Sequence, residues 1–303
     1  MKATKYHQGM HLANDMLLPE EKQCPFCSFT DRKRTIDLQK NPEVFLFQCE
    51  NCFAVSASKM PTKKALDFYY SNYYKEGKKN TIGNAEDMAK HIYKNIYKHL
   101  LVNKLDTINI LDFGGGDAEI SVNLGEYLLT IETVKEINIA LVDYNNVITS
   151  IDNKKIKVKH YFDLMEIDNQ QYDIIIASAI IEHLFSPGIY LKKLFALLST
   201  GGIFYARTPY ILPLLKRFKY SGLDFTYPAH LHDLGQKFWE NILCKLRLQD
   251  KYIIIKSRPS IVETAFNFNF FRTLIAHILK SPWYIFGEKY KIVGGWEIYI
   301  KKI

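Results

Sequence analysis

Residues 110–120, with the sequence ILDFGGGDAEI, decide the fold of this 303-residue chain because an apolar run ends there in three consecutive glycines. From residue 107 onward, short apolar runs alternate with amphipathic stretches typical of helices. The apolar runs are INILDF, INIALVD, KIKVKHYFD, YDIIIASA, GGIFYART, KYIIIKS and WEIYIKK. Strands this apolar, separated by helices, predict a Rossmann-like α/β fold with a mostly parallel, seven-stranded sheet and helices on both faces. The last two runs alternate more clearly, and they predict an antiparallel strand at the carboxyl-terminal edge.

The glycines follow the first predicted strand, at the sheet edge where open α/β folds bind ligands. A dinucleotide fingerprint that starts at Gly114 would need a third glycine where this chain has Glu119. The Glu119 carboxylate would repel a pyrophosphate at the helix N-terminus. A phosphate-binding GK[ST] sequence is also absent after the glycines. The turn is therefore predicted to hold a ligand that has no phosphate there.

The remaining pattern is D-x-G-x-G, formed by Asp112, Gly114 and Gly116. It resembles motif I of the class I methyltransferases that use S-adenosylmethionine. The resemblance implies that Asp112 orients the amino group of the cofactor and that the methionine part passes close over the glycines. The third glycine of the family motif is Ala118 in this chain.

Two further strand ends are similar to cofactor-binding positions of that family. LVDYN ends the second strand with Asp143, where the resemblance implies a carboxylate that binds both ribose hydroxyls, and a carboxylate can accept two such hydrogen bonds. Tyr144 is expected to pack on the adenine. HYFDL ends the third strand, and the resemblance implies that Phe162 and Asp163 contact the adenine ring and its amino group.

The segment YDIIIASAIIEHLFSP resembles the fourth-strand signature of the family, and LLSTGGIFYARTPY resembles the helix, glycine turn and fifth strand that follow. The resemblance implies that Ser178 lies beside the cofactor and that Glu182 and His183 open the next helix. It extends over residues 107–303. A Rossmann-like domain without a methyl donor remains an alternative.

Two CxxC pairs, CPFC and CENC, contribute Cys24, Cys27, Cys49 and Cys52. Each pair turns the chain so that both sulfurs face one ion, and tetrahedral zinc needs two such turns. We therefore predict a structural zinc site with a closed shell of four thiolates. Two disulfides are the alternative, although thiol-rich pairs in a reducing cytoplasm more often bind metal. Cys244 lies in a helical pattern and is expected in the core.

The chain is predicted to have three parts: a zinc ribbon at 1–60, a tyrosine-rich helical connector at 61–106 and an S-adenosylmethionine-binding methyltransferase domain at 107–303. The methyltransferase domain is expected to carry a substrate-facing insertion at about 209–235 and another at about 260–290. In the connector, Asn84 is a candidate N-cap. Most of the connector tyrosines are expected to pack, while one or two line the site; the candidates are Tyr69, Tyr70, Tyr73 and Tyr74.

Methyl transfer from a sulfonium is an in-line displacement, and a hydroxyl or carbon-acid acceptor must also lose a proton. Histidine suits this role near neutral pH. The segment DFTYPAHLHDLG offers His230, which we predict as the base, with His183 second and Tyr227 as the orienting residue. The alternative is that His230 and His232 only cap the following helix.

The order of zinc ribbon, tyrosine-rich connector and methyltransferase core resembles bacterial enzymes that methylate sugars for antibiotics, capsules and lipopolysaccharide. The C-methylating branch carries Tyr-x-Glu-His after the fifth strand, whereas this chain has Tyr227-Pro-Ala-His230 and lacks the long C-terminal extension. We therefore favour O-methylation of a sugar, a nucleotide-linked sugar or a related substituent of surface polysaccharide. C- or N-methylation of a nucleotide-linked sugar stays open.

The formal charge of +8 and the isoelectric point near 9.0 suit a phosphate-bearing partner or an anionic membrane surface, although they also serve solubility. LLKRFKYSG and FNFNFFRTLIAHILKSPWYIF combine cations with large apolar side chains. These two segments are expected to bind a nucleotide-sugar diphosphate, to rest on the inner membrane surface or to pack over the sheet.

Two other function classes compete with this interpretation, and the sequence also predicts a location. An RNA or DNA methyltransferase is disfavoured because the chain has neither an NPPY-like motif nor a stripe of aromatics interleaved with arginine. A zinc-ribbon interaction protein is the non-enzyme alternative. No signal sequence and no apolar run of about 20 residues is present, so a cytoplasmic location is expected.

Overall fold

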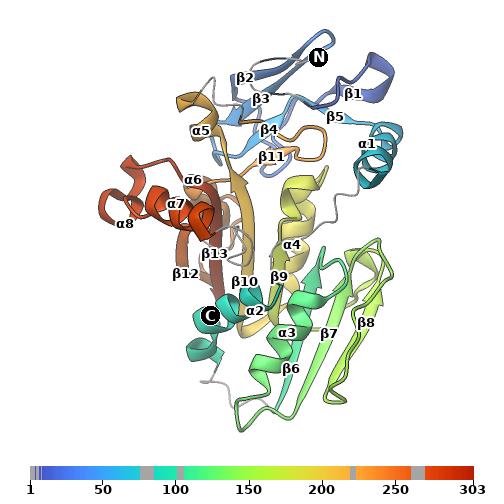
Figure 1. Cartoon of the computed structure of the whole chain (residues 1–303), viewed down its shortest axis with the longest axis vertical. Coiled ribbons are helices and arrows are strands. Elements are labelled where there is room, and N and C mark those ends of the chain that lie inside the picture. Colours follow the sequence, from blue (N-terminus) through green and yellow to red (C-terminus); the bar gives the residue numbers. More distant parts are fainter. Residues whose placement is uncertain are drawn as a thin grey trace.

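A seven-stranded sheet lies at the centre of the lower part of the protein in Figure 1. The computed structural model describes residues 4, 7, 9–75, 85–100, 106–218, 223–260 and 270–303. The strand order is β12-β13-β10-β9-β6-β7-β8. The strands are β6 (Thr107–Phe113), β7 (Glu136–Val142), β8 (Ile156–Tyr161), β9 (Tyr172–Ser178), β10 (Leu198–Tyr210), β12 (Tyr252–Pro259) and β13 (Gly294–Lys302).

The pairing within this sheet confirms the predicted mostly parallel arrangement. Strands β8, β7, β6, β9 and β10 are parallel to one another, and β13 runs antiparallel to both β10 and β12. The carboxyl ends of β6, β7, β8, β9 and β10 therefore meet at one edge of the sheet. That edge is where an open α/β sheet binds its ligand.

Helices cover both faces of the sheet. They are α2 (Ala85–Leu100) and α3 (Glu119–Leu128) on one face, and α4 (Pro187–Leu197) and α6 (Gln236–Lys245) on the other. Helix α2 forms because its apolar residues recur at helical spacing, and those that it buries are Ala85, Met88, Ala89, Ile92, Ile96 and Leu100. The first core cluster lies on the α4 and α6 face, and the second lies under α2 and α3. Asn84, the candidate N-cap, lies outside the described residues.

A smaller four-stranded sheet lies above the main sheet in Figure 1, with the order β11-β4-β3-β2. Its strands are β2 (Arg32–Lys40), β3 (Glu43–Cys49), β4 (Val55–Ala57) and β11 (His232–Asp233). Beside it, β1 (Leu17–Glu20) pairs with β5 (Lys59–Pro61). The short helices η1 (Asn14–Met16) and α1 (Lys63–Lys75) flank these strands.

Strand β11 comes from the segment that was predicted to face the substrate, yet it pairs with β4 of the N-terminal sheet. The same segment contains α5 (Leu212–Arg217), and its residues Phe225 and Leu231 share a core with Leu38 and Leu46 of the N-terminal strands. The two carboxylate oxygens of Asp233 accept hydrogen bonds from the backbone at the start of α5, at 2.6 and 3.1 Å. Burial raises the pKa of Asp233 to about 7.

The loop between Cys24 and Cys27 also packs against the start of α4. The N–H of Gly188 donates to the carbonyl of Pro25 at 3.2 Å, and a Cβ at Gly188 would lie 2.6 Å from the carbonyl oxygen of Phe26. Only a residue without a side chain allows this approach. The N-terminal strands and the main sheet are therefore held together by backbone contact as well as by the shared core.

Glu182 and His183 do not open a helix, which differs from the prediction. They lie in a single 3-10 turn, η4 (Ile181–His183), and α4 begins only at Pro187. Proline is favoured in the first turn of a helix because its fixed φ suits that position and its missing N–H would have no helical partner. The turn leaves both side chains on a loop between β9 and α4.

The remaining short elements follow the strands. They are η3 (Leu164–Glu166) after β8, and α7 (Phe270–Lys280), α8 (Trp283–Phe286) and η5 (Gly287–Lys289) between β12 and β13. Helices α7 and α8 lie on the flank of the molecule in Figure 1. Among the described residues, every helix is too short or too polar to cross a membrane.

Candidate active site

The glycine turn brings its backbone close to two neighbouring side chains. Gly114 and Gly116 have φ values of +71° and +61°, a region that L side chains rarely adopt. A Cβ at Gly114 would lie 2.4 Å from Ile180, and one at Gly115 would lie 2.4 Å from the carboxyl carbon of Asp112. A side chain would therefore clash at Gly114 and Gly115, whereas at Gly116 the space is open and the backbone conformation alone favours glycine.

The Asp112 carboxylate lies beneath this turn and is only 2% exposed. Its Oδ2 atom has no hydrogen-bond partner among the described residues. Burial raises the pKa of Asp112 to about 6, and the charges of Asp143 and Asp117 add to the increase, while a hydrogen bond with Ser121 opposes it. A buried carboxylate with one oxygen that no described residue satisfies is suited to a cationic ligand, and the α-ammonium group of S-adenosylmethionine fits this need.

Asp143 joins the end of β7 to the glycine turn. Its Oδ2 accepts from the N–H of Gly116 at 2.8 Å, and its Oδ1 accepts from the N–H of Asn145 at 2.9 Å. Each carboxylate oxygen keeps further lone-pair capacity for a vicinal diol. The neighbouring Tyr144 is 76% exposed, so its ring is available to cover a ligand. The structure thus brings Asp112, Gly116 and Asp143 together, as the sequence predicts.

Phe162 and Asp163 follow β8 at the same edge of the sheet. The ring of Phe162 is 62% exposed. Asp163 accepts from the N–H of Met165 at 2.8 Å and is hydrogen bonded to Tyr190, whose pKa is raised by burial and then by Asp163. These contacts fix the Asp163 carboxylate at the rim of the site.

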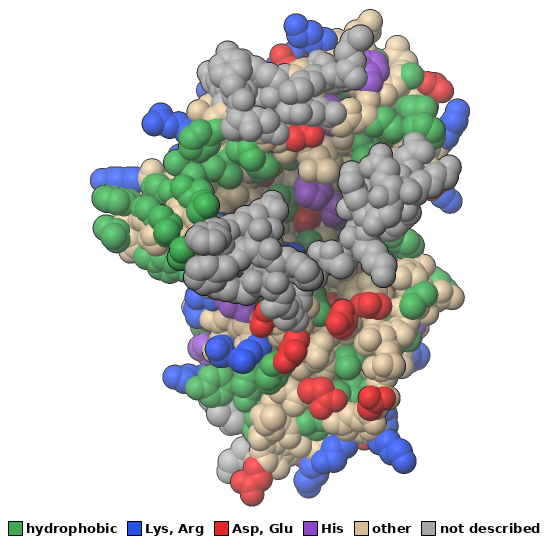
Figure 2. Space-filling view, in the orientation of Figure 1, with side chains coloured by type: hydrophobic (Ala, Val, Ile, Leu, Met, Phe, Trp, Pro, Cys, Tyr) green, Lys and Arg blue, Asp and Glu red, His purple; other side chains and the backbone are tan. Residues whose placement is uncertain are grey.

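A pocket of about 460 Å³ lies between the end of β8 and the start of α4. Its lining residues are Met165, His183, Leu184, Phe185, Ser186, Ile189 and Tyr190. Tyr190 stacks on Phe113, with ring centroids 5.6 Å apart. Most of the lining was not predicted, because nothing in the sequence marks residues after β8 and in α4 as neighbours. Figure 2 shows histidine and acidic side chains in a hollow near the centre of the face that carries this region.

His183 and His230 lie face to edge, with ring centroids 4.9 Å apart. The Nδ1 atom of His183 lies 2.7 Å from the carbonyl oxygen of Ala229. Because a carbonyl can only accept, this nitrogen carries the proton, and the lone pair of neutral His183 is at Nε2. Burial, and then the charge of His183, lowers the pKa of His230 to about 3. His230 is therefore a neutral ring with weak basicity.

The side chains of Tyr227 and His232 both make hydrogen bonds that hold the loop in place. The Tyr227 hydroxyl is buried and donates to the carbonyl of Lys59 at 3.0 Å, and burial raises its pKa. His232 does not cap α6, because its ring nitrogens lie 2.9 Å from the Ser56 hydroxyl and 2.7 Å from the Leu184 carbonyl. The orienting role of Tyr227 stays a prediction, and its hydroxyl already has a partner.

Among the residues that the structure describes, two groups of side chains have the geometry to hold a metal ion. The sulfurs of Cys24, Cys27, Cys49 and Cys52 all lie within 4.8 Å of one another, with Cys24–Cys52 at 3.5 Å and Cys27–Cys49 at 3.7 Å. Zinc–sulfur bonds of about 2.3 Å place neighbouring sulfurs of a tetrahedron roughly 3.8 Å apart, so this cluster fits zinc. All five cysteines of the chain are free thiols, and the prediction that Cys244 lies in the core is wrong, because α6 buries Phe238, Trp239, Ile242 and Leu243 and leaves Cys244 exposed.

The second group consists of Glu182, His183 and His230, whose ligand atoms also lie within 4.8 Å of one another. One carboxylate and two imidazoles would leave coordination positions open for a substrate. Because this group contains both histidines that are candidates for the base, it can either accept a proton or bind a catalytic cation.

A family model described as a methyltransferase domain matches residues 85–245. The plantazolicin methyltransferase bound to S-adenosylhomocysteine is 14% identical with a TM-score of 0.46, and the match covers 79% of this chain and 90% of that one. The Burkholderia thailandensis 1,6-didemethyltoxoflavin-N1-methyltransferase is also 14% identical, with a TM-score of 0.45 and coverage of 78% and 86%. Coclaurine N-methyltransferase is 11% identical, with a TM-score of 0.42 and coverage of 74% and 73%. No curated protein matches the sequence.

Asp112→Asn tests the buried carboxylate. The pKa of Asp112 is raised from 3.8 to about 6 on folding, so the folded protein binds more protons than the unfolded chain between these values. The unfolding free energy of the ligand-free wild type therefore falls as the pH rises through this window. At pH 8 we expect the ligand-free variant to be more stable than wild type by on the order of 2 kcal/mol, and we expect this difference to vanish at about pH 4.

The same substitution is expected to weaken binding of S-adenosylhomocysteine at least about tenfold, because the ammonium group loses its counter-charge. Thermal denaturation between pH 4 and pH 8 and calorimetric titration measure the two effects. Asp250→Asn, an exposed position outside the glycine turn, is the control. A D112N protein that is less stable at pH 8 and binds the ligand normally would show that the carboxylate has only a structural role.

Proposed function

This chain belongs to the methyltransferase-domain family and is an S-adenosylmethionine-dependent methyltransferase, and we propose that it O-methylates a saccharide. In this proposal the acceptor is a sugar, a nucleotide-linked sugar or a related substituent of surface polysaccharide. The observation that carries the cofactor assignment is the buried Asp112 oxygen without a partner beneath a turn that only glycine can form. Support for the acceptor comes from the histidine geometry and from the resemblance of the sequence to sugar methyltransferases.

The residues at the sheet edge would hold the cofactor by complementary chemistry. The Asp112 carboxylate would bind the ammonium group, and Asp143 would accept from the two ribose hydroxyls. Tyr144 and Phe162 would pack on the adenine, and Asp163 would accept from its amino group. Ser178 would lie beside the methionine part. When bound, the cofactor supplies a methyl group on a positively charged sulfur, which leaves as a neutral thioether.

We propose His183 as the general base, which reverses the order that the sequence favours. Its Nδ1–H is held by the Ala229 carbonyl, so Nε2 presents a lone pair, and the ring lines the pocket. As the acceptor oxygen takes the methyl group that the bound cofactor would supply, Nε2 of His183 would accept the hydroxyl proton. His230 packs against this ring and stays neutral, because its pKa is about 3. Tyr227 would orient the loop that carries His230.

The pocket and the loop both favour an oxygen acceptor over a carbon acid. A carbon acid needs more help with proton removal than a hydroxyl, and Ala229 stands where the C-methylating branch has glutamate. In this chain Ala229 contributes only its backbone carbonyl, which accepts a hydrogen bond from Nδ1 of His183. The pocket offers Ser186 as a polar contact and the rings of Phe185 and Tyr190 as apolar surfaces, a combination that suits a sugar ring.

We further propose that the four cysteines bind one structural zinc ion. The four sulfurs would complete a closed shell, so the ion would take no part in catalysis. Cys24, Cys49 and Cys52 belong to the same core cluster as Phe238 and Trp239 of α6. The zinc would therefore stabilise the junction between the N-terminal strands and the catalytic domain.

A divalent cation on Glu182, His183 and His230 is a second candidate mechanism, supported by their clustered ligand atoms. Such a cation would act as a Lewis acid on the acceptor oxygen. If a chelator leaves both the activity and the zinc content unchanged, His183 acts as a general base without a cation. If the chelator abolishes the activity and Mg²⁺ or Mn²⁺ restores it, a divalent cation takes part in catalysis.

His183→Gln and His230→Gln separate the two rings. We expect H183Q to lower kcat at least about a hundredfold with unchanged affinity for S-adenosylhomocysteine, because the proton acceptor is lost. H230Q should lower kcat by less than about tenfold, since its ring is already a weak base. His11→Gln, at an exposed position, is the control. Full turnover by H183Q, with kcat lost in H230Q, would restore His230 as the base.

Comparison of surface glycans from cells with and without the gene tests the acceptor. Mass spectrometry should show one glycan component that is lighter by a single CH2 group when the gene is deleted, and fragmentation locates the missing methyl group. The purified enzyme should restore the methyl group on the isolated acceptor. Unchanged glycans together with a missing methyl group in RNA or DNA would overturn the saccharide assignment and leave the methyltransferase assignment intact.

Metal analysis tests the cysteine site. The purified chain should contain one zinc ion, and Cys52→Ser should lose most of it and unfold at a temperature lower by roughly 5 °C or more, because metal binding and folding are coupled. Cys244→Ser, which changes an exposed free thiol, should retain both the zinc and the unfolding temperature. Zinc retained by C52S at wild-type stability would contradict the four-thiolate site.

A further inference from the structure

Arg207, near the carboxyl end of β10, is a buried cation for which the described part of the chain offers no partner. It is 8% exposed, its Nε atom has no hydrogen-bond partner, and no ion pair joins it to any residue of the described ranges. Buried charges in proteins are normally paired, because the loss of hydration is costly. The site of this guanidinium is therefore suited to an anion that the chain itself does not supply.

The direction of the Arg207 side chain follows from the alternation of the strand. Tyr205, two residues earlier, points toward α2, where its hydroxyl lies 3.7 Å from the sulfur of Met88. Side chains two residues apart in a strand share a face, so Arg207 also faces α2. In the register of the sheet, Arg207 lies between Ser178 of β9 and Glu297 of β13.

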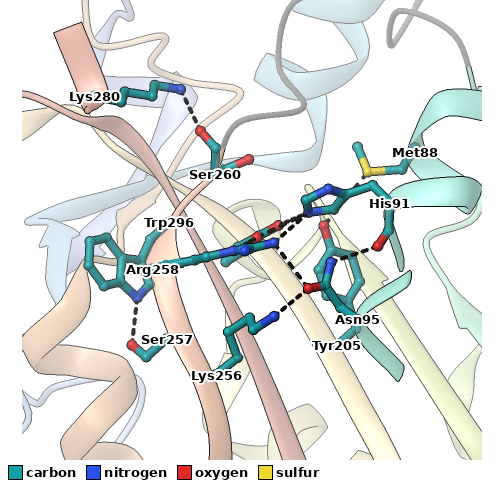
Figure 3. A network of polar contacts seen from close by, with 11 residues as sticks. Met88, His91, Asn95, Tyr205, Lys256, Ser257, Arg258, Ser260, Lys280 and Trp296 are labelled. Carbon is teal, nitrogen blue, oxygen red and sulfur yellow. Dashed lines mark hydrogen bonds and ion pairs between the residues drawn. The ribbon is translucent and has the colours of Figure 1, made fainter. Parts of the chain in front are cut away.

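Glu297 does not neutralise Arg207. Its carboxylate pairs with Arg258 of β12, and its oxygens lie 2.9 and 3.1 Å from Nε2 of His91 on α2 (Figure 3). Figure 3 also shows Lys256 and Arg258 converging on this network. Burial, and then the charge of Arg258, lowers the pKa of Lys256, whose ammonium group donates to Asn95. The Glu297 carboxylate is therefore taken up by Arg258 and His91, and it does not pair with Arg207.

Ser178 lies on the other side of Arg207 and is likewise a buried polar side chain. It is 7% exposed, and its hydroxyl has no hydrogen-bond partner among the described residues. The alternation of β9 places it on the α2 face with Ile174 and Ile176. Asp112 of β6, next to β9, has the same parity as Ile110 of that cluster and also has an oxygen without a partner. A carboxylate, a hydroxyl and a guanidinium thus stand on three adjacent strands of one face, at the edge that carries the glycine turn.

We propose that Arg207 and the Ser178 hydroxyl form an oxyanion-binding subsite of the active site, which takes a carboxylate or a phosphate group. The guanidinium presents a fork of N–H donors that matches two oxygens of such a group, and the hydroxyl adds a third donor. The oxyanion has two sources, the carboxylate of the methionine part of the cofactor or an anionic group of the acceptor. This inference requires only that the chain is a methyltransferase, and it holds whether or not the acceptor is a saccharide.

Arg207→Met in the full-length protein is the central test, with Arg247→Met, an exposed position, as the matched control. Without ligands, the R207M protein should unfold at a temperature about 2 °C or more above wild type, because the variant no longer buries an unpaired charge. An arginine with a purely structural role would give the opposite shift. Arg207→Lys, which keeps the charge, serves as a second variant and should keep binding of the anionic probe within about tenfold of wild type.

Binding is measured with three probes: inorganic phosphate, S-adenosylhomocysteine and 5′-methylthioadenosine. Inorganic phosphate, titrated at constant ionic strength into protein saturated with S-adenosylhomocysteine, should raise the unfolding temperature of wild type and R247M but not of R207M if the acceptor supplies the anion. If the cofactor supplies it, R207M should bind S-adenosylhomocysteine at least about tenfold more weakly and bind 5′-methylthioadenosine, which lacks the amino-acid part, as wild type does. Wild-type responses of R207M to all three probes would overturn the proposal.

Discussion

One buried histidine fixes the geometry on which the site depends. His232 bridges the Ser56 hydroxyl of the N-terminal sheet and the Leu184 carbonyl of the loop between β9 and α4. Burial lowers the pKa of His232 to about 4, so the ring is neutral and carries one proton. That proton must be on Nε2, which faces a carbonyl, and Nδ1 must then accept from the serine. His232 thereby holds the segment that presents His230 against His183 and the Ala229 carbonyl against His183 Nδ1.

The parts of this protein that sequence alone predicts are those encoded by short-range patterns. The seven apolar runs, the glycine turn with Asp112, and the two CxxC pairs can each be recognised from a few consecutive residues. The pairing of β11 with β4 has no such signal, since it joins residues 176 positions apart through two residues of strand. The contact between the His183 and His230 rings also has no local signal, because it exists only in the folded chain. Arg207 was missed for the same reason, since its burial and lack of a partner exist only in the folded chain.

The ligand-free site carries two buried charges of opposite sign, Asp112 and Arg207, neither of which is neutralised by its neighbours. Both raise the free energy of the folded chain when no ligand is present. Ligands that bring an ammonium group and an oxyanion remove both penalties, and they stabilise the folded state in proportion to their affinity. The fold is therefore least stable when empty, and the same groups that destabilise it make binding selective for charged ligands.

In the proposed mechanism, the histidine pair determines where the proton of the acceptor goes. The two rings lie 4.9 Å apart, and burial lowers the pKa of His230 to about 3, so His230 would not compete for the proton. The proton would move to His183, whose ring lines the pocket and whose Nδ1 is fixed by the Ala229 carbonyl. From there it can pass to solvent without crossing the core, so that the base is regenerated on the side of the site from which the acceptor enters.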